Sequence, residues 1–264
     1  MVLESVLRSA QPCLAGRKIR DAVIGISLLA IELDNGHIGV SYILREDLDP
    51  GCSNFPYASS MIGCDAAEIA QWAITGCESL QRAIGVAALN AASRSLALED
   101  CETTDRPFGV QFKKTDNVGM IGHIPPVVRM LAPRVKAVYV FDKAKLQSPV
   151  ERNDVLPMEE QPCVLPQCDV VIMSGTTVIN GSIDSLLEIC RGAREIIMIG
   201  PSTPMFPEAF VDTGVTVLAG SWWKSENKDL IFKAISLAGG TPFLGHSAIK
   251  KTVRVSKEVS CNLH

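Results

Sequence analysis

The sequence predicts an α/β protein in which a small α+β unit precedes a doubly wound parallel sheet. A hairpin followed by helices occupies about the first hundred residues, and short apolar runs alternate with helical segments from residue 117 onward. The 264 residues, 47% of them hydrophobic, are enough for two compact units with their own cores. We place the two domains at residues 1–105 and 106–264, with the polar stretch from Asp100 to Gly109 as the linker.

The first unit begins with a short amphipathic helix over Val2–Ala10 and continues into a hairpin. The two strands are expected over Val23–Leu33 and Ile38–Leu44, joined by Asp34-Asn35-Gly36-His37. Asn-Gly favours a type I′ turn, because both central residues must take positive φ. The long loop that follows, Arg45–Gly63, is either functional or a surface excursion.

Two helices complete the predicted first unit. Asp65 and Glu68 have the spacing of a capping box that opens a helix towards Trp72. A longer helix is expected from Glu78 to Leu98, because its apolar residues recur at a helical period.

The second unit has the texture of a parallel sheet that is covered on both faces. Its apolar runs are almost continuous, which is typical of strands buried between helices, and the order of strands and helices predicts a Rossmann-like sheet. The expected strands are Val118–Ile121, Ala137–Phe141, Val170–Met173, Ile196–Ile199 and Thr216–Ala219. The expected helices are Pro125–Leu131, Ser182–Arg191, Pro207–Thr213 and Lys224–Ala238. Lys145–Cys168 contains four prolines and is expected to be an irregular crossover or a flap.

Ligands of such sheets bind beyond the carboxyl ends of the strands, where the strand order reverses. In the first loop at this edge, Gly119 and Gly122 allow close approach of a ligand, although a tight structural turn explains them equally well. His123 lies at the mouth of this loop as a candidate catalyst or as an ordinary packed histidine. Asp142, which ends the next strand, has the position of a carboxylate that accepts ribose hydroxyls, or of a solvated strand end.

The loop after the third strand, Ser174–Ser182, gives the strongest indication of a site. It offers hydroxyls, an amide, two glycines and a helix N-terminus, a set that suits a carboxylate or a phosphate. Capping by Ser182 explains part of this pattern, but Thr176 and Asn180 are interpreted as ligand contacts. The stiff loop Gly200–Pro207 is expected to form a pocket wall or a structural turn, and Gly220–Trp223 a stacking surface or an ordinary turn.

Other site types receive little support. The sequence has no CxxC or HxxxH spacing for a metal, so no metal ligands are proposed. Ser174, His123 and Asp142 would make a triad on paper, but no GxSxG elbow accompanies them. The glycine loop is not a GxGxxG fingerprint, which ranks a nicotinamide dehydrogenase last.

Charge and cysteine content bear on partners and compartment. A net charge of −4 gives no footprint for nucleic acid, and basic pairs such as Lys250-Lys251 are interpreted as solvated surface. No segment has the pattern of a signal peptide or of a membrane span. The nine cysteines are scattered and odd in number, which favours reduced thiols, no intramolecular disulfide and a cytoplasmic protein. A homo-oligomer is compatible with these features.

Three segments together carry a resemblance to a known family: Asn117–Pro126, Ser174–Leu187 and Gly200–Pro207. The stretches SGTTVINGSIDSLLE and IGPSTPMFPEAF are the most specific. They resemble uncharacterised prokaryotic proteins known as the putative heavy-metal chelation domain family. The first unit is similar to that family's companion domain, which has an enolase N-terminal-like fold, so the resemblance covers nearly the whole chain.

The resemblance implies a Rossmann-like domain with a cleft roofed by the enolase-like domain. It also implies a role in making, modifying or handling a metal chelator or a pterin-like compound. Carried over to this chain, the cleft uses residues from three loops of the second unit and two asparagines of the first. These residues are Gly119, Gly122, His123, Ser174, Gly175, Thr176, Asn180, Pro201, Ser202, Asn54 and Asn90, and a buried structural role is an equal alternative for Asn90.

Three functions follow from these observations. The first is an enzyme or binding protein for a small anionic chelator or cofactor precursor (pterin-like or siderophore-like), with any metal held through the ligand itself. The second is an adenosyl-methionine-dependent methyltransferase, which Asp142 and the glycine loop favour. The third is a non-catalytic carrier of a metal or chelate, which would need converging carboxylate, thiol or imidazole groups.

Overall fold

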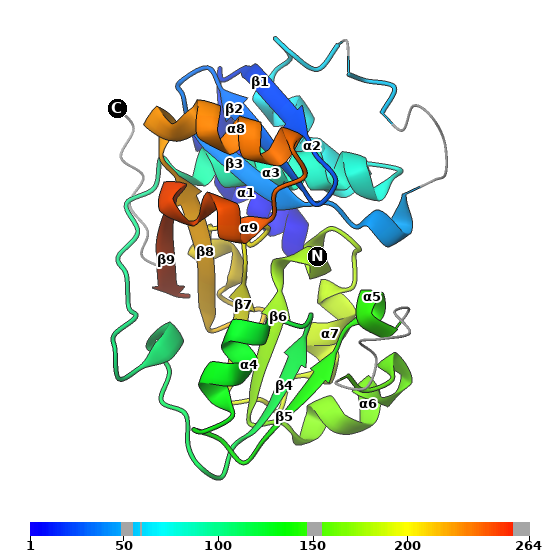
Figure 1. The fold of residues 1–264 in the computed structure, drawn as a ribbon, viewed down its shortest axis with the longest axis vertical. Coiled ribbons are helices and arrows are strands. Elements are labelled where there is room, and N and C mark those ends of the chain that lie inside the picture. Colours follow the sequence, from blue (N-terminus) through cyan, green and yellow to red (C-terminus); the bar gives the residue numbers. More distant parts are fainter. Residues whose placement is uncertain (49–54, 59, 147–154, 256–264) are drawn as a thin grey trace.

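The computed structural model describes residues 1–48, 55–58, 60–146 and 155–255 of the chain (Figure 1). It contains a three-stranded sheet of order β1-β2-β3 and a six-stranded sheet of order β5-β4-β6-β7-β8-β9. The first sheet is antiparallel and the second is parallel except for β9. The α/β class predicted from the sequence is therefore confirmed. No helix in these ranges is long and apolar enough to cross a membrane.

The small sheet packs against a layer of helices. Its strands are β1 (Ile19–Ile24), β2 (Leu28–Leu33) and β3 (Ile38–Tyr42). The helices are α1 (Val2–Leu14), α2 (Ala66–Thr75) and α3 (Ser79–Ser93). α3 approaches β3 so closely that a Cβ on Gly39 would lie 1.9 Å from the carbonyl oxygen of Ala87. This contact requires a glycine, and it fixes α3 on the sheet.

Local details of the first unit differ from the sequence prediction. The segment predicted as one strand, Val23–Leu33, is interrupted at residues 25–27 and comprises the end of β1 and the whole of β2. The type I′ turn is wrong, because Gly36 has a φ of +82° while Asn35 does not have a positive φ. A turn with a single left-handed glycine is the bulged hairpin that often replaces type I′. The cap at Asp65 is confirmed, since its carboxylate accepts the amide of Ala67 at 2.8 Å.

The large sheet follows the prediction closely over its parallel part. Its strands are β4 (Asn117–Ile121), β5 (Ala137–Phe141), β6 (Val170–Ser174), β7 (Glu195–Ile199), β8 (Val217–Trp223) and β9 (Ala248–Arg254). The antiparallel edge strand β9 was not foreseen. Counted from β4, the parallel strands have the order 2-1-3-4-5, which is a doubly wound arrangement.

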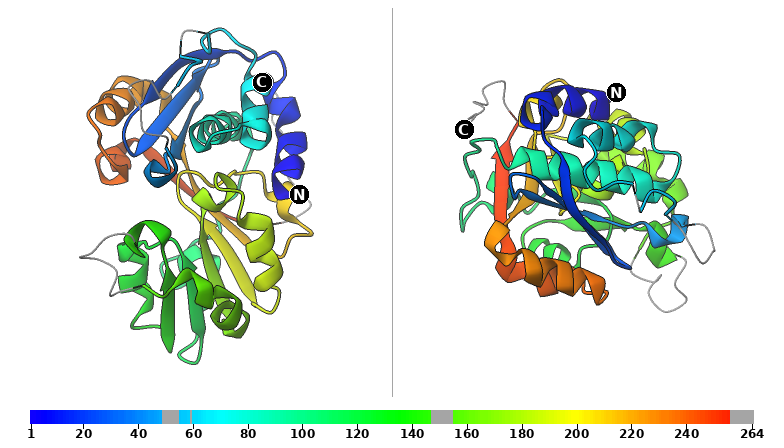
Figure 2. Two further views of the ribbon diagram at one scale, coloured as in Figure 1. Left: turned by 90° about the vertical axis from the view of Figure 1, so that its right-hand side faces the viewer. Right: turned by 90° about the horizontal axis from the view of Figure 1, so that it is seen from above.

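Helices cover both faces of this sheet (Figure 2). α4 (Pro125–Leu131) packs on one face, where Val118, Met120 and Leu131 share a core. The other face carries α7 (Ile183–Ile189) and the turn η7 (Pro207–Phe210). The turn η7 is shorter than the helix expected over Pro207–Thr213. The described part of the proline-rich crossover contains short helices and helical turns: α5 (Lys143–Leu146), η4 (Met158–Glu160), α6 (Gln161–Val164) and η5 (Leu165–Gln167).

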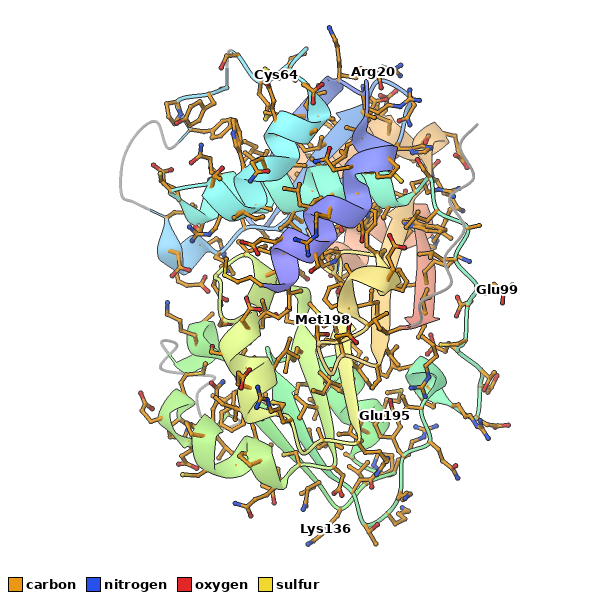
Figure 3. All side chains as sticks on the ribbon, turned by 180° about the vertical axis from the view of Figure 1, so that it is seen from behind. Arg20, Cys64, Glu99, Lys136, Glu195 and Met198 are labelled. Carbon is orange, nitrogen blue, oxygen red and sulfur yellow. The ribbon has the colours of Figure 1, made fainter. Side chains whose placement is uncertain are left out.

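All parallel strands point their carboxyl ends at the first unit. Figure 3 shows Lys136 and Glu195, which stand at the amino ends of β5 and β7, at the end of the molecule opposite to Arg20 and Cys64. The functional edge of the sheet is therefore the edge that the first unit covers.

The last helices of the chain lie on the first unit. α8 (Lys228–Ser236) packs on the face of the small sheet opposite to α3, in a core with Leu28, Val40 and Trp223 (Figure 1). α9 (Thr241–Leu244) joins the same core through Leu244. The boundary at residue 105 stays a prediction, because the small sheet is completed by a helix from far along the chain.

An ion-pair cluster fixes α8 on the small sheet. Lys228 Nζ lies 2.8 Å from Asp21 Oδ2 and 2.7 Å from Glu32 Oε2. The hydrogen bonds that the Lys228 ammonium donates to Asp21 and Glu32 raise the pKa of Lys228, so its charged form is favoured. Glu32 is buried, and its other ion-pair partner in the described residues, Arg20, is 3.5 Å away.

We expect Lys228→Met to lower the free energy of unfolding by about 2–3 kcal/mol, because it leaves a buried carboxylate with poor compensation. Urea denaturation of both proteins measures this loss. Lys233→Met, on an exposed position of the same helix, removes the same charge and should change stability by less than about 0.5 kcal/mol. Equal effects of the two substitutions would contradict the anchoring role of Lys228.

Candidate ligand-binding site

The strand order reverses between β4 and β6. The chain passes from β4 to β5 on one side and then returns to place β6 on the other side of β4. A pocket of about 850 Å³ lies at this point, and its walls come from both units. This volume is typical of small-molecule sites, which span roughly 300–1,000 Å³. The structure thus has a pocket where the sequence places the ligand, while ligand binding itself stays a prediction.

The first loop lines the pocket through Gly122 and His123. Gly122 has a φ of +89°, and a Cβ there would lie 2.8 Å from Cβ of Ser174, so glycine lets the ends of β4 and β6 meet. Gly119 was expected to border the ligand, but it lies inside β4, where a Cβ would be 2.7 Å from Leu165. It does not line the pocket, and its small size serves packing instead.

Asp142 stands at the end of β5 and lines the pocket. Its Oδ2 accepts the backbone amide of His123 at 2.7 Å, so the carboxylate fixes the first loop. A role in binding ribose hydroxyls stays a prediction. The next residue, Lys143, donates to Asp47 of the first unit at 3.0 Å and joins the two units at the pocket wall.

The third loop lines the pocket through Ser174, Thr176 and Asn180. Much of its hydrogen bonding is internal, since Ser174 Oγ accepts from the Thr176 hydroxyl at 2.9 Å. Asn180 Oδ1 accepts from the amide of Ser182 at 3.0 Å and from its hydroxyl at 2.7 Å. Turn formation therefore accounts for part of the hydrogen bonding of Thr176 and Asn180, and their role as ligand contacts stays a prediction. The amide nitrogen of Asn180 keeps no partner within the described ranges and is exposed.

Two further residues predicted as ligand contacts join the units instead of lining the pocket. Ser202 Oγ accepts the Tyr42 amide at 2.9 Å and lies 3.2 Å from Ser41 Oγ. The amide nitrogen of Asn90 donates to the carbonyl of Pro201 at 2.7 Å. Each of Ser202 and Asn90 is at least 97% buried. Neither side chain lines the pocket, because the Ser202 hydroxyl and the Asn90 amide nitrogen are engaged between the units, and their assignment as ligand contacts stays a prediction.

Gly175 has a packing role of the same kind. A Cβ on Gly175 would lie 2.5 Å from backbone atoms of Ser202 and Thr203, so glycine lets the third and fourth loops touch. It does not line the pocket, whereas Pro201 does. Asn54 lies outside the described residues.

The wall formed by β8 and β9 was not foreseen. Gly220–Trp223 belongs to β8 instead of a turn, and Lys250, interpreted as surface, lines the pocket. Strand β9 (Ala248–Arg254) could have been predicted from its β-branched residues Ile249, Thr252 and Val253, which are typical of strands.

A strained aromatic residue borders this wall. Phe108 has a φ of +57° and a ψ of 20°, a left-handed conformation that costs a bulky residue about 1–2 kcal/mol. Glu102 holds it, because one carboxylate oxygen accepts the Phe108 amide at 3.3 Å and the other accepts the Thr252 hydroxyl at 3.1 Å. The side chains of Phe108 and Glu102 both line the pocket.

Two protein-family models match this chain. The model of a family described as "Putative heavy-metal chelation" matches residues 107–254, and a second model of the same description matches residues 7–93. The chain belongs to this family. The family resemblance inferred from the sequence is confirmed, and its two parts follow the order of the two units.

Two solved structures and one curated protein are similar to this chain. A crystal structure of a family protein of unknown function from Pyrococcus horikoshii is 25% identical, with a TM-score of 0.76 over 97% of this chain and 100% of that chain. One from Desulfitobacterium hafniense is 20% identical, with a TM-score of 0.73 over 95% and 98% of the two chains, and shows the shared fold. An uncharacterised protein of Methanocaldococcus jannaschii is 30% identical over 156 residues, which are 58% of this chain and 59% of that protein.

The donor atoms of the pocket do not fit direct ligation of a heavy-metal ion. Soft ions prefer thiolates, but the sulfur that lines the pocket belongs to Met158, and the imidazole belongs to His123 alone. Burial raises the pKa of Cys168 to about 11 and that of Cys190 to about 12, so these thiols stay protonated. Within the described ranges, no three His, Cys, Asp or Glu residues are grouped as metal ligands.

The cysteines give a direct test of this environment. At pH 8, iodoacetamide should modify the exposed Cys77 and Cys163 in the folded protein and leave Cys168 and Cys190 unmodified. After unfolding without reductant, mass spectrometry should find all nine cysteines alkylated, because the seven in the described ranges are free thiols. Cys52 and Cys261 lie outside those ranges. Two or more stoichiometric disulfides would contradict the reduced state expected from the sequence.

Proposed function

We propose that the pocket binds or modifies a small anionic molecule of the class that includes metal chelators and pterin-like or siderophore-like compounds. The observation that carries this proposal is the pocket of about 850 Å³ at the reversal of the strand order, with walls from both units. A metal reaches the site as part of the ligand, because the pocket offers donors for an anion and not the ligands of a soft cation. The family name, heavy-metal chelation, agrees with cargo of this kind.

Four carboxylates line the pocket, those of Glu46, Asp47, Glu102 and Asp142, and the case for an anion rests on the donors that have no protein partner. Lys143 is neutralised by Asp47, whereas Lys250 has no ion pair within the described residues. The exposed amide nitrogen of Asn180 adds a donor near the other end of the pocket. A charge-assisted hydrogen bond is about twice as strong as a neutral one, so these groups would contribute most to affinity.

His123 is the candidate for chemistry. It is half-buried and lines the pocket next to Asp142, with its backbone held by that carboxylate. An imidazole in this place can transfer a proton near neutral pH. Proton transfer would distinguish an enzyme from a carrier.

Adenosyl methionine is the second candidate ligand, and the position of Asp142 favours it. The carboxylate follows the strand adjacent to β4 and lines the pocket, as expected for a group that accepts ribose hydroxyls. A methyltransferase would use the same pocket for cofactor and substrate.

A thermal-shift screen tests the proposal. The panel contains polycarboxylate, catechol and hydroxamate chelators with and without Fe³⁺, pterins, adenosyl methionine and the metal salts alone. A ligand at a hundred times its Kd stabilises the protein by about 2.7 kcal/mol, or roughly 5–10 °C in Tm for a chain of this size. Stabilisation by adenosyl methionine alone would select the second candidate. If the metal salts alone stabilise as well as the chelates do, the proposal fails.

Asn180 separates the two roles of the third loop. Asn180→Ala removes the side-chain oxygen that accepts the amide of Ser182. This variant should lose about 0.5–2 kcal/mol of stability and should also bind the ligand more weakly. Asn180→Asp keeps an acceptor for Ser182 but replaces the amide donor with a negative charge. We expect its Tm to match the wild type while its affinity for the best anionic compound of the screen falls at least tenfold. Calorimetric titration measures both affinities, and unchanged binding by Asn180→Asp would move the ligand away from this loop.

A further inference from the structure

The hairpin of β8 and β9 turns one face towards the pocket. In its register, Ser221 pairs with Lys250, Trp223 with Ala248, and Ala219 with Thr252. All six residues line the pocket. Because side chains alternate along a strand, Ser221 and Trp223 share a face, and the opposite pair Ser221–Lys250 has Cβ atoms about 4.5–5.5 Å apart.

Donors on this face have no partners within the described residues. Trp223 is 3% exposed, and its indole Nε1 is buried without a hydrogen bond. The hydroxyl of Ser221 and the ammonium of Lys250 also make none there. An unsatisfied buried donor destabilises a protein, and such atoms in folded proteins call for a missing partner as the explanation.

The adjacent residues of the same types provide an internal comparison. Trp222 donates from Nε1 to Ser93 Oγ at 3.0 Å, and Lys251 donates from Nζ to the carbonyl of Leu98 at 3.1 Å. Trp222, the neighbour of Trp223, and Lys251, the neighbour of Lys250, therefore both have acceptors within the protein. Trp222 does not line the pocket, whereas Lys251 lines it as Lys250 does but already has a protein acceptor.

We propose that Ser221, Trp223 and Lys250 form a subsite for a carboxylate or phosphate group. Its oxygens would accept from the indole and the hydroxyl, and its charge would pair with the ammonium. The nearby carboxylate of Glu102 is already occupied by Thr252 and Phe108. The subsite rests on the proposed function and deepens it. β8 is two strand spacings, or about 10 Å, from β6, so one ligand that reaches both ends of the pocket carries its acidic group at the β8 end.

Inorganic phosphate is the probe for this subsite, and the readout is the indole N–H signal of Trp223 in ¹⁵N–¹H spectra. The chain has three tryptophans, and Trp223→Phe assigns the signal by its loss. We expect phosphate to shift this signal with a saturable dependence on concentration. The signals of Trp72 and Trp222 should stay in place. A Trp223 signal that does not respond to phosphate overturns the subsite.

Substitution of Lys250 distinguishes a specific contact with phosphate from a general effect of net charge on phosphate binding. Lys250→Met, at an exposed position that should not disturb folding, should weaken phosphate binding about tenfold to a hundredfold. Lys233→Met on α8 lowers the net charge equally, lies outside the pocket, and should bind phosphate like the wild type. Equal binding by Lys250→Met and the wild type overturns the subsite.

The two proposals fail separately. If a compound from the screen binds the wild type and Lys250→Met with the same affinity, the pocket binds a ligand but the subsite is wrong. If phosphate shifts Trp223 through Lys250 while no compound of the panel binds, the subsite stands and the proposed ligand class fails.

Discussion

The hydrogen bonds between β3 and the loop after β7 set the position of every other part of the site. β3 is an edge strand of the small sheet, so its backbone groups need partners from outside that sheet. Ser202 accepts the amide of Tyr42, and Asn90 links the carbonyls of Val40 and Pro201. Because these groups are buried, losing either would leave unsatisfied polar atoms at the joint. The two walls of the pocket hold their spacing through this joint.

The sequence contained enough information for the fold of the second unit. Its parallel strands are buried on both faces, and such strands leave a strong apolar signal in one dimension. β9 was missed because an edge strand has one exposed side, and Lys250, Lys251 and Arg254 interrupt its apolar pattern. The return of α8 to the first unit depends on contacts between residues some 200 positions apart, such as Lys228 with Asp21. No local pattern encodes such a contact.

The sequence predicted where the candidate site lies but not which residues line it. The reversal of strand order follows from topology, so the loops at the carboxyl ends had to meet there. Small polar residues in those loops have two uses, however. Ser202 and Asn90 bridge backbone groups, Gly175 permits a close contact, and Asn180 accepts the amide of Ser182 in the turn before α7 while also lining the pocket. Only the partners of each polar atom distinguish these uses, and partners are a property of the folded chain.

The same criterion gives meaning to the lysines of β9. Edge strands carry lysine to discourage pairing with other chains, so a lysine in β9 is expected whether or not a ligand exists. Lys251 and Arg254 already meet this need, and both are held by protein acceptors, the carbonyl of Leu98 and the carboxylate of Glu195. Lys250 differs because its register places it opposite Ser221 and beside the buried, unsatisfied indole of Trp223. Protection of an edge explains a charge but not an orphaned donor next to it, whereas an oxyanion in the pocket explains both.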